Sequence, residues 1–208
     1  MRYTKSYCVN FVIATVVACL AGWPSAGGAQ TVMGQASAVQ ATVLGIATGL
    51  ADTGTLGGTT DAREASQITG SVPSLLTGEA LHATTIGWPD QVASEASVGN
   101  LNLTIAGSGI SADLVMARAQ SGLGSAGTGL TNIAGLTIGG VPVFPTGSPN
   151  QALSLAGLTI VLNEQMLSAG GIVVNALHVR TLDGLTDVVI GSAKASITSF
   201  TESLPSLF

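Results

Sequence analysis

The stretch that decides the fold runs from Gly171 to Thr198 and reads GIVVNALHVRTLDGLTDVVIGSAKASIT. Val and Ile dominate both halves, and β-branched residues of this kind favour strands. Asp183-Gly184 separates the halves and is typical of two-residue hairpin turns in which both residues adopt positive φ. The stretch therefore predicts a β-hairpin with strands Gly171 to Thr181 and Thr186 to Thr198.

Alternation within the strands predicts which face is buried. In the first hairpin strand, the predicted buried face consists of Val173, Asn175, Leu177 and Val179. His178 and Arg180 then point to the opposite face. The same argument predicts one apolar face for Ile110, Ala112, Leu114 and Met116. Alanine alternation at Ala36-Ala38 and Ala193-Ala195 predicts two sheets that approach each other closely.

Similar strand patterns recur along the chain, while frequent Gly, Thr, Ser and Val disfavour long helices. The expected strands are Gln35 to Ile46, Glu79 to Ile86, Glu95 to Ala106, Ser111 to Gln120, Gly135 to Val143, Ala152 to Asn163, Gly171 to Thr181 and Thr186 to Thr198. They predict an all-β protein, an antiparallel β-sandwich or barrel-like sheet stack with Gly/Ser/Pro-rich loops. Between Ala51 and Gly70 we expect a long loop, or a short helix around Thr60 to Gln67.

Weak internal similarity offers a second fold hypothesis. Residues 134–138 and 156–160 both read AGLTI, and Leu103-Thr104-Ile105 echoes them. A β-solenoid with Thr rows would need this period to continue through many turns. The repeat stops after three partial copies, so the composition explains it better.

The first 29 residues have the layout of a secretory signal peptide. Arg2 and Lys5 precede an apolar stretch from Cys8 to Ala21, and a Gly/Ala/Pro/Ser run follows it. Small residues at such a junction favour cleavage, here after Ala29. Lipid attachment at Cys19 is the alternative. We therefore expect a helical signal peptide over 1–29, followed by one β-rich domain over 30–208.

Composition excludes several function classes. Both cysteines of the chain, Cys8 and Cys19, lie in the leader, so thiol, disulfide and Cys-ligated metal chemistry are not expected beyond it. Residues 30–208 carry four cations against eleven acids, a net charge of −7. Such a chain has no basic patch for nucleic acid, and it would be repelled by anionic membrane surfaces. No apolar run after residue 30 reaches the eighteen residues that a spanning helix needs.

Several motifs suggest chemistry but have simpler interpretations. Gly122 to Gly127 matches GxGxxG, yet no helix and no correctly spaced acid follow it, which favours a flexible loop. His82 and His178 are the only histidines, and no hydrolase or zinc motif surrounds them. Asn102-Leu103-Thr104 is a glycosylation acceptor inside a predicted strand.

Three acids near the hairpin are the remaining candidates. Asp183 and Asp187 flank its turn and could hold calcium together with backbone carbonyls, although turn carboxylates are more often solvated. Glu164 follows an apolar strand and could form a structural pair with Arg180 or His178. As a general acid it would need a second carboxylate at hydrolase separation. We therefore assign no catalytic, cofactor-binding or metal-binding residue.

The order of several motifs resembles the bacterial choice-of-anchor P family. These motifs are Gly34 to Ala38, Gly140 to Val143, Pro149 to Gln151, Leu162 to Gln165, Val174 to Val179 and Asp187 to Ala193. The resemblance implies an exported, surface-associated β-protein without established enzymatic activity, from a family with varied C-terminal attachment signals. The chain departs from it at Leu204 to Phe208, which lacks the Thr-Gly of a sortase signal.

Together these observations favour a secreted or cell-surface, non-catalytic module of the cell envelope or extracellular matrix, with a structural or adhesive role. Its expected partners are envelope or matrix components, or further copies of itself. No cofactor is expected. The alternative is a secreted carbohydrate-active hydrolase that uses Glu164, Asp183 or Asp187. Aromatic residues make up only 4% of the chain, which counts against a sugar-binding cleft.

Overall fold

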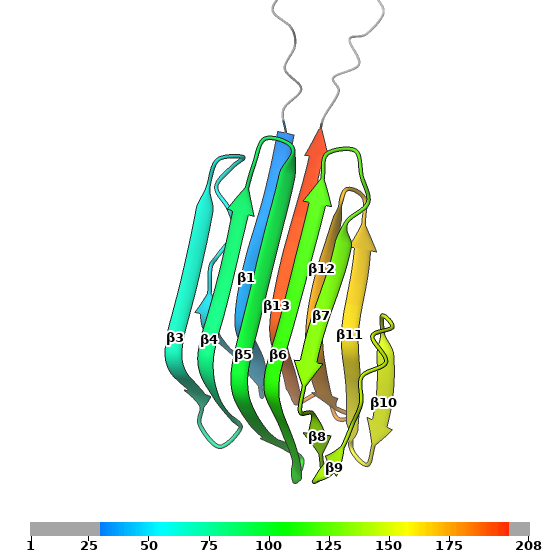
Figure 1. The fold of residues 1–208 in the computed structure, drawn as a ribbon. Coiled ribbons are helices and arrows are strands. Elements are labelled where there is room, and N and C mark those ends of the chain that lie inside the picture. The colour runs from blue at the N-terminus through cyan, green and yellow to red at the C-terminus, as the bar shows by residue number, and fades with distance from the viewer. Residues whose placement is uncertain (1–29, 200–208) are drawn as a thin grey trace, which may run out of the picture.

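The computed structural model describes residues 30–199, which are all-β (Figure 1). The expected fold class is therefore confirmed. Within this range no helix is long or apolar enough to cross a membrane. The predicted signal peptide and the C-terminal segment at Leu204 to Phe208 lie outside the described residues.

Two antiparallel sheets form the sandwich. The terminal sheet, named for the ends of the described chain, has the order β10-β11-β12-β13-β1-β2, and the central sheet has the order β3-β4-β5-β6-β8-β9, with β7 also pairing with β6. The strands of the terminal sheet are β1 (Gln30–Val43), β2 (Ile46–Asp52), β10 (Gln151–Leu155), β11 (Leu158–Ser168), β12 (Gly171–Thr181) and β13 (Thr186–Ser199). Those of the central sheet are β3 (Ala62–Val72), β4 (Leu76–Gly87), β5 (Gln91–Ile105), β6 (Ser108–Gly122), β7 (Thr128–Ala134), β8 (Thr137–Ile138) and β9 (Val141–Pro142).

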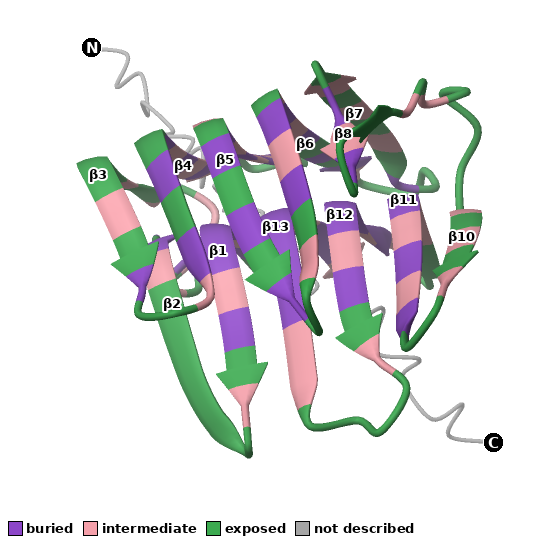
Figure 2. Cartoon of the chain, turned by 90° about the horizontal axis from the view of Figure 1, so that it is seen from below, coloured by how far each residue is buried: buried purple, intermediate pink, exposed green. Residues whose placement is uncertain are grey.

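Strand β1 pairs with β13 along almost its whole length, from Gln30 opposite Ser199 to Val43 opposite Thr186. The first and last described residues are therefore neighbours at one end of the sandwich (Figure 1). Seen from below, the two sheets form two layers, and buried residues alternate with more exposed ones along many of the strands (Figure 2).

The predicted hairpin is present, but its turn differs from the expected one. Four residues, 182–185, connect β12 to β13, and of Asp183 and Gly184 only Gly184 has positive φ, at 72°. The carboxylate of Asp183 accepts a hydrogen bond from the Leu185 N–H at 3.0 Å. This side-chain bond closes the turn in place of the two-residue turn that Asp-Gly predicted.

The region between Ala51 and Gly70 corrects a second expectation in part: residues 53–61 form a loop, whereas β3 occupies residues 62–70, where the loop or the short helix was expected to continue. Most of its side chains are exposed, and so the alternation that marks a half-buried strand is absent. Pairing with β4 supplies the backbone hydrogen bonds that local sequence does not predict.

Other boundaries also shift. The expected strand Gln35 to Ile46 ends at a turn at Leu44-Gly45, beyond which the chain returns as β2. Likewise β10 and β11 divide the expected strand Ala152 to Asn163. Gly135 to Val143 contains only the two-residue strands β8 and β9, and β7 was not predicted.

The inward face of β5 reverses partway along the strand. Val92, Ser94, Ala96 and Val98 are buried at even positions, whereas Leu101, Leu103 and Ile105 are buried at odd positions. Gly99 and Asn100 lie between these runs, and Asn100 has a φ of 45°. Pairing with β6 skips Asn100 on one strand and Asp113 on the other, so the register is kept while the alternation changes phase. We call this reversal the phase switch.

Five further strands contain the phase switch: β1, β4, β6, β12 and β13. In the terminal sheet, the residues at the phase switch lie in one row across the strands. The pairing of β1 with β13 leaves out Ala38 and Gly191, and the pairing of β12 with β13 leaves out Ala176. Positive φ occurs in this row at Ala51 of β2, Gly191 of β13 and Asn163 of β11. The phase switch is thus a property of the whole terminal sheet.

The phase switch corrects the predicted buried faces. In β12 the residues before it are buried at Ile172, Val174 and Ala176, and those after it at Leu177 and Val179. Asn175 therefore faces outward, although uninterrupted alternation predicted it on the face of Leu177. In β6 the prediction is confirmed for the buried Ile110 and Ala112, but beyond the switch Val115 is buried while Leu114 and Met116 are half-buried.

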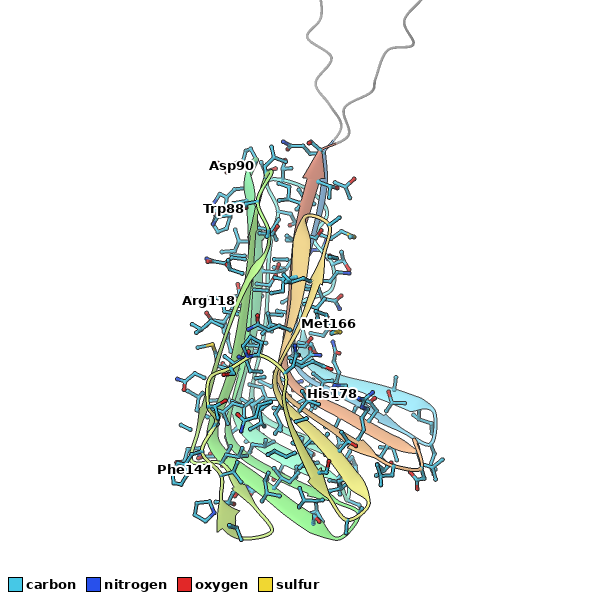
Figure 3. All side chains as sticks on the ribbon, turned by 90° about the vertical axis from the view of Figure 1, so that its right-hand side faces the viewer. Trp88, Asp90, Arg118, Phe144, Met166 and His178 are labelled. Atoms are coloured by element: carbon cyan, nitrogen blue, oxygen red, sulfur yellow. The ribbon has the colours of Figure 1, made fainter. Side chains whose placement is uncertain are left out.

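Inward residues differ in size on the two sides of the phase switch. Toward the chain ends the core is mostly small, with Ala36, Ala96, Ala117, Ala119, Ala193 and Ala195 all buried. Beyond the switch it is made of larger residues, including Leu101, Leu103, Ile110, Ile160 and Leu177. Figure 3 shows the result: the sheets lie close together toward the chain ends, and the strand ends spread apart at the opposite end. We call these the narrow half and the wide half.

Polar contacts cross the narrow half because the sheets are so close there. The Ser94 hydroxyl donates to the Lys194 carbonyl at 2.6 Å, and the Ser121 hydroxyl donates to the Gly170 carbonyl at 2.8 Å. Both pairs join the central sheet to the terminal sheet. The expectation of close sheet approach from alternating alanines is confirmed for this half.

A substitution at Gly34 tests whether the two sheets lie this close together. A Cβ atom added there would lie 2.3 Å from Thr85 Oγ1 and 2.6 Å from Leu56 Cδ1. We expect Gly34→Ala to lower the free energy of unfolding by about 1–3 kcal/mol through overpacking. Gly109→Ala in β6 is the control, because an added Cβ there meets nothing within 4 Å. Urea unfolding measures both, and equal stability of the two variants would contradict the close packing.

Candidate functional site

A chain of five polar side chains lies on the outer face of the terminal sheet, beside the phase switch. Glu164 comes from β11, Asn175 and His178 come from β12, and Asp187 and Ser192 come from β13. Asn175 is the cross-strand neighbour of both Glu164 and Ser192. The site therefore spans three adjacent strands.

The phase switch assembles this chain. Asn175 and His178 are three residues apart in β12, so regular alternation would place them on opposite faces. Both instead bond to the same oxygen, Glu164 Oε2, because the inward face reverses between Asn175 and His178. The predicted pairing of Glu164 with His178 is thus present in the structure.

Each member of the chain has a defined partner. His178 Nδ1 lies 2.8 Å from Glu164 Oε2, and His178 Nε2 lies 2.9 Å from Asp187 Oδ1. The Asn175 amide donates to Glu164 Oε2 at 2.7 Å, and the Ser192 hydroxyl donates to Asn175 Oδ1 at 2.8 Å. The side chains of His178 and Glu164 are only 11% and 16% exposed. Solvent therefore competes little for the bond between them.

This geometry limits the chemistry of His178. A histidine that acts as general base must present one ring nitrogen to a nucleophile while a carboxylate orients the other. Here both nitrogens are held by carboxylates, and the Ser192 hydroxyl donates to Asn175 instead of contacting the ring. Both carboxylates receive an N–H together only when the ring is protonated. The arrangement is a cross-strand clamp of β11, β12 and β13.

Asp183 and Asp187 do not act together. Asp183 accepts hydrogen bonds from the Thr181 hydroxyl and the Leu185 N–H. These bonds, chiefly the one from Thr181, lower the pKa of its carboxyl below the usual range. Asp187 instead contacts His178. Across residues 30–199, no group of three or more His, Cys, Asp or Glu side chains is arranged to hold a metal ion.

The other candidate motifs lie apart from the clamp. His82 in β4 faces Glu64, with Nδ1 3.7 Å from Oε1 and both side chains exposed. Residues 123–127 of the GxGxxG stretch connect β6 to β7, and β7 follows where a nucleotide-binding helix would begin. Asn102 lies in strand β5 as predicted, and its side chain is exposed.

A shallow polar groove of about 600 Å³ lies on the outer face of the central sheet and was missed by the sequence analysis. Its polar lining residues are Thr69, Ser71, Thr77, Glu79, Asn100, Asn102, Ser111 and Asp113. The Asn100 amide donates to Glu79 Oε2 at 2.7 Å. Ala80 and Asn100 have positive φ beside it, so the phase switch also shapes this groove. In the sequence, the Gly99-Asn100 dipeptide is the signal that could have indicated an irregular strand at this position.

The clamp predicts a measurable coupling. We expect His178→Ala and Glu164→Gln each to lower the free energy of unfolding by about 1–3 kcal/mol, because each leaves a poorly solvated partner. In the double mutant the losses should be less than additive, with a coupling of about 0.5–3 kcal/mol.

His82→Ala and Glu64→Gln supply the matched control, since that pair joins the same residue types at an exposed position. Their coupling should stay below about 0.5 kcal/mol. Urea unfolding of all variants measures both cycles. Equal couplings would refute the clamp.

No family model matches the chain, and comparisons with curated proteins and with solved structures likewise found no significant match.

Proposed function

We propose that the protein is an exported, non-catalytic module of the cell surface or extracellular matrix, with a structural or adhesive role. The observation that carries this proposal is the clamp. His178 is the histidine best placed for acid–base chemistry, and both of its ring nitrogens are engaged by carboxylates. Its position across β11, β12 and β13 suits a residue that stiffens a scaffold.

The expected localisation rests on the leader sequence and the composition. The first 29 residues have the order of charges, apolar residues and small residues typical of export. Both cysteines fall in that leader. A sandwich whose narrow half is joined by Ser94 and Ser121 hydroxyls needs no disulfide to align its sheets. These features fit a rigid module outside the cytoplasm, in contact with envelope or matrix components or with other copies.

Within residues 30–199, the outer face of the central sheet suits the hydrolase alternative better than the clamp or the β12–β13 turn does. Glu164 and Asp187 are engaged by His178, and Asp183 closes a turn. The outer groove of the central sheet instead presents Glu79 and Asp113. A hydrolase would therefore lose activity on Glu79→Gln or Asp113→Asn, whereas the proposed module has no activity to lose.

Localisation and abundance in the native host test the proposal. We expect the surface or extracellular fraction to contain a chain that begins at or near Gln30. His178→Gln should leave association with that fraction close to the wild-type level. Leu177→Ala should abolish accumulation there, because deleting this fully buried side chain costs about 2–5 kcal/mol.

Three outcomes would overturn the proposal: one from localisation, one from the phenotype of the host and one from an activity assay. A full-length chain in the cytoplasm would exclude export. Loss of the host phenotype in His178→Gln, at normal abundance and stability, would identify His178 as a functional residue. Hydrolysis of a polysaccharide that stops on Glu79→Gln would identify an enzyme.

A further inference from the structure

Two hairpin turns meet at the end of the wide half and expose four large aliphatic side chains. The turn between β1 and β2 carries Leu44 and Ile46, which are 70% and 73% exposed. The turn between β12 and β13 carries Leu182 and Leu185, which are 70% and 50% exposed. The Leu44 N–H donates to the Leu185 carbonyl at 2.8 Å, which fixes the two turns side by side. We call these four residues the apolar tip.

The backbone at Leu44 makes this exposure costly. Leu44 and Gly45 have φ values of 49° and 81°, as in a type I′ turn. Such a turn favours Asn-Gly, whereas leucine at positive φ suffers a steric clash of its Cβ. An asparagine at position 44 would interact better with water and would adopt positive φ more easily. The chain nevertheless has an exposed leucine there. Backbone strain of this kind is concentrated at functional sites.

The position of the apolar tip suits contact with another surface. The first residue of β1, Gln30, and the last residue of β13, Ser199, pair at the opposite end of the sandwich. Figure 3 shows both hairpins bending outward beyond the body of the molecule, on the side labelled by His178. The tip is a protrusion, and its four side chains are 50–73% exposed.

Size and charge select the kind of surface. A stable protein interface uses about 20–30 residues on each side, so four side chains on a narrow protrusion are too few for pairing with a second copy. Aliphatic side chains can instead enter the interfacial region of a bilayer, where binding grows with the apolar area buried. Asp183 is the one charged residue within the two turns. Together with the net charge of −7 for residues 30–208, it disfavours anionic lipid.

We propose that the apolar tip inserts into the interfacial region of a zwitterionic lipid bilayer and holds the module at a membrane surface. Leu44, Ile46, Leu182 and Leu185 supply the inserted side chains. The β12–β13 hairpin, clamped through His178, presents Leu182 and Leu185, and the hydrogen bond between Leu44 and Leu185 holds Leu44 and Ile46 beside them. The inference concerns the folded module and does not depend on the proposed export.

A fluorophore at the tip tests this proposal independently of the apolar leader. The full chain carries Cys8→Ser, Cys19→Ser and Leu182→Cys, and its single thiol is labelled with a nitrobenzoxadiazole dye. We expect phosphatidylcholine vesicles to shift the emission to the blue, and a quencher attached to the lipid chains to reduce it. Ile68→Cys in place of Leu182→Cys is the control, because Ile68 is 89% exposed in β3, away from the tip. It should show neither effect.

Adding Leu44→Asn separates binding from folding. The substitution creates the favoured Asn-Gly turn, so we expect the Tm to rise while the apparent affinity for vesicles, read at the Leu182 label, falls about tenfold or more. A lower Tm would show that Leu44 is a packing residue and would overturn the proposal.

Three further outcomes would also overturn it. Vesicles could leave the label at the tip unchanged. They could shift the labels at Leu182 and Ile68 equally, which would mean nonspecific adsorption. A blue shift that grows with protein concentration and needs no vesicles would identify a second copy as the occupant.

Discussion

The two sheets pack closely in the narrow half and spread apart in the wide half. The phase switch, where the inward face of the strands reverses, separates the two halves. Alanine, glycine and serine line the narrow half, whereas leucine and isoleucine line the wide half. A strand of uninterrupted alternation can bend between two such halves only gradually. At a left-handed residue such as Asn100 or Gly191, pairing skips one residue on each of two neighbouring strands, and the inward face reverses there.

Both candidate sites depend on this reversal. The clamp needs Asn175 and His178 on one face, which a regular strand forbids. The polar groove lies beside Ala80 and Asn100, where the central sheet has its own bulges. The apolar tip projects because the terminal sheet bends outward beyond the switch (Figure 3). One structural device thus shapes the core, the outer faces and the protruding end.

Sequence patterns predicted the all-β class and the hairpin of β12 and β13, because β-branched residues are dense there. They failed at β3, an edge strand whose exposed side chains leave no alternation to detect. They also placed Asn175 on the wrong face, because the prediction assumed uninterrupted alternation along β12, whereas its inward face reverses after Ala176. The pairing of Glu164 with His178 was predicted as one option, but the role of Asp187 depended on a strand register that one sequence does not reveal. In β5 the sequence itself contains a signal of the switch. Most apolar residues fall at even positions up to Val98, and all fall at odd positions from Leu101 onward, with Gly99-Asn100 between them.

A cysteine scan of β5 tests the phase switch most directly. Residues 30–208 contain no cysteine, so single substitutions in a Cys8→Ser, Cys19→Ser chain each give one thiol. Thiol labelling in the folded protein should be slow at positions 92, 94, 96 and 98, and then slow at positions 101, 103 and 105. Positions 95, 97, 100, 102 and 104 should react faster. Slow labelling that continues through positions 100, 102 and 104, with fast labelling at 101 and 103, would show one unbroken strand and contradict the account.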